Sequence, residues 1–72
     1  MDAKELRAAL KKESHQGNMV FDMDVHNFAM WYYEKYLCGQ VRPPNAGMYA
    51  EGWVECVLND EELMFWWAVF KM

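Results

Sequence analysis

The chain of 72 residues contains no isoleucine and no threonine, and only two prolines and four glycines. Isoleucine and threonine are enriched in β-strands, whereas this chain instead carries seven alanines and seven methionines, which suit helices. These counts favour helices over strands. We therefore expect a mainly α fold, a compact bundle of three to four short helices, in a single small domain spanning residues 1–72.

Cysteine and long apolar runs are also scarce. The two cysteines, Cys38 and Cys56, are too few for the disulfide framework of a small secreted domain, so we expect free thiols. The longest apolar run, Leu63 to Phe70, has eight residues, well short of the roughly 18 that a membrane span needs. The first residues are charged, unlike a secretion signal. The expected location is cytoplasmic, without membrane contact.

Residues typical of catalysis and metal binding are few and scattered. The possible metal ligands His15, His26, Cys38 and Cys56 form none of the close pairs that zinc sites use. The single serine, Ser14, stands at the end of a predicted helix, and no glycine-rich phosphate loop is present. We expect no enzymatic activity, no cofactor and no metal.

Basic residues are sparse beyond the first 14 positions. Residues 1–14 hold four basic and three acidic side chains, whereas residues 15–72 hold three basic and eight acidic ones. An acidic body argues against direct nucleic-acid binding, because phosphate contacts need clustered lysine and arginine. It favours a protein partner with a basic face, such as a nucleic-acid-handling complex.

Residues that begin and end helices recur along the chain. Asp2 and Asn59 are placed to cap two helices, and the three acidic residues after Asn59 suit the positive end of a helix dipole. Asp24 and Gly39 are placed to begin and end a central helix. The helices predicted from these signals lie near residues 2–14, 24–38 and 60–71.

The segment 46–58 is ambiguous. As a helix it would be capped by Asn45, and Glu51, Glu55 and Asn59 would form one polar stripe. As a strand, its second half would form a C-terminal β-hairpin packed on two helices, although the connecting loop lacks the glycine that tight hairpins prefer. We favour the helix and keep the α+β hairpin as the alternative.

The central helix is expected to carry much of the core, and the apolar residues 19–21 before it are expected to turn inward. One arc of the helix is apolar and should be buried: Val25, Phe28, Ala29, Tyr32 and Tyr36. Trp31 and Tyr33 lie off this arc, towards the polar side. Because tryptophan and tyrosine are enriched in the energetic centres of interfaces, both are candidate contacts for a partner.

Apolar residues make up 54% of the chain, above the roughly 45–50% usual for soluble domains, and in so small a domain some of this apolar surface must face outward. On the last helix, Phe65 lies on a second apolar edge, which suggests either a homodimer or a site for another protein. The side chains expected to bind a partner are Trp31, Tyr33, Glu34, Glu51, Glu55 and Phe65.

The function expected from these patterns is that of a small acidic protein-binding module without enzymatic activity. Such an inhibitor or adaptor would dock an aromatic patch with an acidic rim on a basic partner surface. In size and charge, though in no motif, the chain resembles many phage-encoded anti-defence proteins, anti-CRISPR proteins among them. Two alternatives remain. One is a structural homo-oligomer, and the other is a helix-turn-helix-like nucleic-acid-binding protein that uses the basic first helix, with Lys4, Arg7, Lys11 and Lys12 on phosphate.

Overall fold

The computed structural model describes residues 1–15 and 19–72. The elements in this part of the chain are α1 (Ala3–Glu13), α2 (Met23–Tyr32), the π-helical turn η1 (Tyr33–Leu37), α3 (Ala50–Val57) and α4 (Asp60–Lys71). These residues include no β-strand, so the mainly α prediction is confirmed and the hairpin alternative is not supported.

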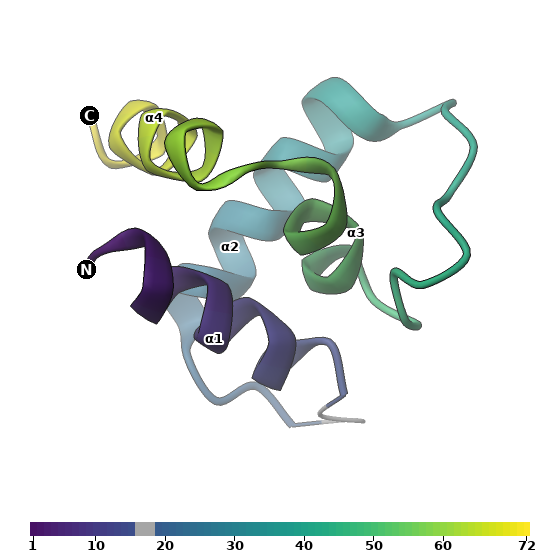
Figure 1. The fold of residues 1–72 in the computed structure, drawn as a ribbon, viewed down its shortest axis with the longest axis horizontal. Coiled ribbons are helices and arrows are strands. Elements are labelled where there is room, and N and C mark those ends of the chain that lie inside the picture. Colours follow the sequence, from purple (N-terminus) through teal and green to yellow (C-terminus); the bar gives the residue numbers. More distant parts are fainter. Residues whose placement is uncertain (16–18) are drawn as a thin grey trace.

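The helices pack around one core. Helix α1 packs against α2, α3 and α4, and α2 runs behind it to reach α3 and α4 as well (Figure 1). The loop after η1 forms one edge of the molecule and returns the chain to α3. The buried apolar side chains come from every helix: Leu6, Leu10, Val25, Phe28, Ala29, Tyr32, Leu37, Ala46, Trp53, Val54, Leu58 and Leu63.

Two of the four predicted N-terminal caps, Asp2 and Asn59, are confirmed. The Asp2 carboxylate accepts a hydrogen bond from the backbone N–H of Glu5, and Asn59 forms a reciprocal capping box with Glu62. The prediction of Asp24 as a cap is wrong. The cap is Asp22, whose carboxylate accepts from the backbone N–H groups of Asp24 and Val25, so α2 begins at Met23.

The π-helical turn changes which residues of the central helix are buried. In η1 the backbone N–H of Cys38 donates to the carbonyl of Tyr33 at 2.9 Å, which puts one extra residue into the turn. Leu37 therefore takes the inward position after Tyr32, and Tyr36 points outward. The prediction that Tyr36 belongs to the buried arc is wrong. Gly39 adopts the predicted left-handed conformation, with φ of 91°.

Helix α3 is shorter than predicted. It begins at Ala50 after Tyr49, which makes no side-chain cap, so the prediction of Asn45 as its cap is wrong. The backbone turns at Gly47, where φ is 76°, and the preceding loop folds back over α3. At Gly52 a Cβ atom would lie 1.7 Å from the carbonyl oxygen of Ala46, so only glycine allows this crossing.

The apolar segment before α2 does not enter the core, contrary to prediction. Met19, Val20 and Phe21 are exposed. The buried carboxylate of Glu13 accepts hydrogen bonds from the backbone N–H groups of Phe21 and Asp22, which fixes the segment along the end of α1. The ammonium of Lys12 lies 4.6 Å from the centre of the Phe21 ring.

Candidate protein-binding surface

Helix α4 packs on α2 and η1 through a continuous layer of aromatic rings. We call this layer the aromatic surface, and its members are Trp31, Tyr32, Tyr36, Phe65, Trp66 and Phe70. Trp66 is at its centre: its ring lies 4.8 Å from that of Tyr36 and 4.9 Å, edge to face, from that of Phe65. Such tilted and edge-on pairs are the favoured geometries for aromatic side chains.

Two rings of the aromatic surface are open to solvent. Phe65 is 58% exposed and Tyr36 is 41% exposed, while Tyr32 beside them is buried. Burial raises the pKa of the Tyr32 phenol, and the negative charge of Glu62 nearby raises this pKa further. The aromatic surface therefore includes a buried ring, Tyr32, two exposed rings and a carboxylate close to them.

Trp31 belongs to this layer rather than to a polar face. Its ring packs 5.6 Å from Phe70 and 6.3 Å from both Phe28 and Trp66, and the ammonium of Lys35 lies 5.8 Å from the ring centre. The interpretation that Trp31 lies among polar residues is wrong, because α4 crosses α2 on that side. Trp31 is half-buried and supports the exposed rings.

Tyr33 lies apart from the aromatic surface. The half-buried Tyr33 packs edge to face on Trp53 of α3 at 5.3 Å, on the side of α2 that faces α3. Glu34 is exposed. The structure therefore divides the predicted set: Trp31 and Phe65 both contact Trp66, whereas Tyr33 contributes to the contact between the central helix and α3.

The prediction that Glu51 lies in an exposed acidic rim is wrong. Glu51 is 1% exposed, and its carboxylate lies 3.1 Å from Nδ1 of His26. It is buried because α2 packs on this side of α3, which the spacing of the acidic residues alone does not show. A carboxylate in this position joins α2 to α3 and is not available to a partner.

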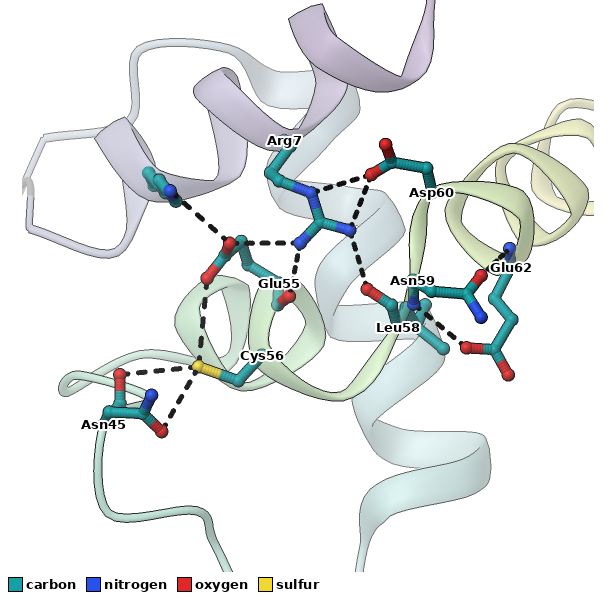
Figure 2. A network of polar contacts seen from close by, with 9 residues as sticks. Arg7, Asn45, Glu55, Cys56, Leu58, Asn59, Asp60 and Glu62 are labelled. Atoms are coloured by element: carbon teal, nitrogen blue, oxygen red, sulfur yellow. Dashed lines mark hydrogen bonds and ion pairs between the residues drawn. The ribbon is translucent and has the colours of Figure 1, made fainter.

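Glu55 is also engaged within the molecule, by Arg7 of α1. The guanidinium donates to the Glu55 carboxylate at 3.0 Å and to the Glu55 carbonyl at 2.7 Å (Figure 2). The same group donates to the carbonyl of Leu58 at 2.8 Å and to the carboxylate of Asp60 at 3.0 Å. One side chain thereby satisfies carbonyls at the C-terminus of α3 and pairs with the first residue of α4.

This network weakens the hypothesis that the basic first helix binds phosphate groups. Burial lowers the pKa of Arg7, but the hydrogen bonds and charges of Glu55 and Asp60 outweigh burial and raise it. Arg7 stays charged, and its donors point at α3 and α4. The ammonium of Lys11 also lies 3.8 Å from Glu55. The face proposed for phosphate contacts is thus partly neutralised by acids of the same chain.

Cys56 lies beside the same network and is poorly placed to act as a nucleophile. Its thiol contacts the carbonyl of Asn45 at 3.4 Å. Burial raises the pKa of the Cys56 thiol, the adjacent Glu55 raises it further, and Arg7 and Lys11 offset part of the rise. Cys56 and Cys38 are free thiols. Within residues 1–15 and 19–72, no three histidine, cysteine or acidic side chains gather as a metal site would require.

Sequence reasoning missed the roles of Tyr36, Trp66 and the acids of α4. Tyr36 was assigned to the core because a regular α-helix was assumed through residue 38. Glu61 and Glu62 were read only as complements to the helix dipole, although they precede Phe65 and Trp66 by one helical turn each. The wide apolar arc of the last helix was the signal that could have located this surface.

Comparisons with models of protein families, with curated proteins and with solved structures found no match to this chain. Among the described residues, none of the helices has the length and apolar character needed to cross a membrane.

Proposed function

We propose that this chain is a protein-binding module without catalytic activity of its own, acting as an inhibitor or adaptor that docks through the aromatic surface. The observation that carries the proposal is the exposure of Phe65 and Tyr36, at 58% and 41%, each in contact with Trp66. Large aromatic side chains exposed together are typical of interface centres, where they supply much of the binding free energy.

The exposed rings stand on a fixed support. Phe65 and Trp66 belong to α4, whose start is secured by the capping box of Asn59 and Glu62. Trp66 also packs on Tyr32 at 5.5 Å and on Trp31 at 6.3 Å. Side chains held in this way lose little conformational freedom on binding, so more of the contact free energy is retained as affinity.

Charge favours a partner with a basic face. The first turn of α4 places Glu61 and Glu62 at one end of the aromatic surface, and the whole chain has a net charge of −4. Opposite charges around an apolar centre speed association and exclude partners of the wrong sign. A complex that handles nucleic acids has such a face and is the class of partner we propose.

The test compares two exposed apolar residues. Phe65→Ser removes the outermost ring of the aromatic surface, while Val41→Ser makes a similar change in the loop after η1, where Val41 is almost fully exposed. A partner captured from the native host is identified by mass spectrometry, purified and titrated against all three proteins. We expect Phe65→Ser to weaken binding at least about 30-fold, the range for an interface centre. Val41→Ser should bind as wild type does.

Equal affinity of Phe65→Ser and wild type for the purified partner would place the interface elsewhere and contradict the proposal. Light scattering of the unmodified chain measures its mass in solution and so distinguishes a homodimer from a monomer. If a dimer forms and Phe65→Ser converts it to a monomer with unchanged helicity, a second copy covers the aromatic surface, and a separate protein partner is not needed to explain it.

A further inference from the structure

Cationic groups of the chain already lie against rings of the α2–α4 contact. The ammonium of Lys35 is 5.8 Å from the centre of Trp31, and that of Lys71 is 5.0 Å from the centre of Trp67. A cation within about 6 Å of a ring centre is attracted by the negative face of the ring. Trp31 and Trp67 are thus each supplied with a cation, and no such contact is found at Tyr36 and Phe65 within the described part of the chain.

Carboxylates stand next to two rings of the aromatic surface, Phe65 and Trp66. On α4, Glu61 and Glu62 precede Phe65 and Trp66 by four residues, a spacing that puts each acid and ring side by side on the helix surface. Glu62 uses one oxygen to close the capping box, while the exposed Glu61 makes no hydrogen bond through its side chain in this part of the structure. An exposed ring with an adjacent carboxylate offers a cation both a π-face and a counter-charge.

We infer that the aromatic surface binds an arginine side chain of the partner, with its guanidinium lying on Phe65 and paired with Glu61. This inference rests on the proposed function and names the group that the partner supplies. Arginine fits better than lysine, because its planar guanidinium stacks on rings, is less strongly hydrated and can still direct N–H donors to a carboxylate.

The probes are three short capped peptides of the same length. One contains arginine and glycine, the second has citrulline in place of each arginine, and the third has lysine. Citrulline keeps the planar shape and most donors but has no charge. Binding is followed by nuclear magnetic resonance through the indole N–H of Trp66, whose ring contacts both exposed rings. The arginine peptide should shift this signal and bind at least threefold more tightly than either of the others.

Two glutamates provide a matched pair of variants. Glu61 and Glu5 are both exposed and both lie in the first turn of a helix, α4 and α1 respectively. Glu61→Gln should weaken the arginine peptide about two- to fivefold, and Glu5→Gln, which changes the net charge equally, should leave it unchanged. Phe65→Ser should remove the Trp66 shift.

Several outcomes would overturn the inference. Equal weakening by Glu61→Gln and Glu5→Gln would mean attraction to net charge alone. Equal binding of the arginine and citrulline peptides would show that the positive charge does not contribute to binding. Equal binding of the arginine and lysine peptides would show that the surface does not prefer arginine. No shift with any peptide would also overturn it. If one of these results occurs while Phe65→Ser still loses the purified partner, the proposed function stands and only the arginine contact is wrong.

Discussion

Among the side chains that are partly exposed to solvent, Arg7 should be one whose replacement lowers the stability of the fold most. Its guanidinium, 24% exposed as a side chain, bonds the carbonyls of Glu55 and Leu58 and the carboxylates of Glu55 and Asp60. Arg7→Met keeps the aliphatic stem in place but leaves both carbonyls at the end of α3 without this donor. Hydrogen bonds to a charged group contribute about 1.5–3 kcal/mol each when buried, and less with partial solvent access.

We therefore expect Arg7→Met to lower the free energy of unfolding by about 2–3 kcal/mol, less than the sum of the separate bonds because water reaches part of the site. In a domain of this size, that loss corresponds to a fall in Tm of about 10–20 °C. Urea unfolding followed by circular dichroism measures it directly. Arg7→Lys should recover only part of the loss, because a lysine cannot reach carbonyls of α3 and the carboxylate of Asp60 together.

Lys11 supplies the matched control. It is the next basic residue on the same side of α1, its side chain is 63% exposed, and its ammonium is 3.8 Å from Glu55. Lys11→Met removes the same charge but should change stability by less than about 0.5 kcal/mol. If Arg7→Met and Lys11→Met cause the same small loss, the network does not stabilise the α3–α4 junction and the reasoning is refuted.

Three further predictions follow from the packing. Gly52→Ala should destabilise the fold by at least about 3 kcal/mol in urea unfolding, because its Cβ would meet the Ala46 carbonyl oxygen at 1.7 Å; a loss below about 1 kcal/mol would show that the loop can move away. Trp31→Ala should cost about 3 kcal/mol by the same assay, since its ring packs against α4, and unchanged stability would restore it as a free partner contact. Cys56 should be alkylated more slowly than the exposed Cys38 at pH 8 and reach its full rate at a higher pH than an ordinary thiol, because its raised pKa leaves less thiolate at any given pH; mass spectrometry over a pH series measures both rates, and equal rates would contradict the burial of Cys56.

Local signals in the sequence were sufficient to predict α1 and α4. Asp2 and Asn59 cap α1 and α4 because their short polar side chains reach the free N–H groups of the first turn, which requires nothing from the rest of the chain. Gly39 takes the left-handed conformation for an equally local reason. The identity of Asp22 rather than Asp24 as the α2 cap depends also on Glu13, whose carboxylate holds the preceding backbone from another helix.

The candidate site was harder to predict, because it depends on contacts between helices. Nothing local to Glu51 shows that it meets His26, or that the loop before α3 folds back and delays the start of that helix. Trp31 was placed on the polar side by the helical wheel alone, and the wheel does not show where α4 crosses. Phe65 was identified correctly as a residue on an uncovered apolar edge. The apolar face of α4 is too wide for one core to cover, and the position of Phe65 on this face follows from helical spacing alone.

The π-helical turn makes the number of residues before Gly39 as consequential as their chemical identity. Because the turn holds one residue more than an α-helical turn, it brings Leu37 inward and leaves Tyr36 on the surface beside Trp66. Deleting one residue from 33–36 would allow a regular helix that still brings Leu37 inward, as the fourth residue after Tyr32, and would remove or displace the exposed ring of Tyr36. In evolutionary terms, a single-codon insertion or deletion here changes several surface positions in one step, whereas each substitution alters one side chain.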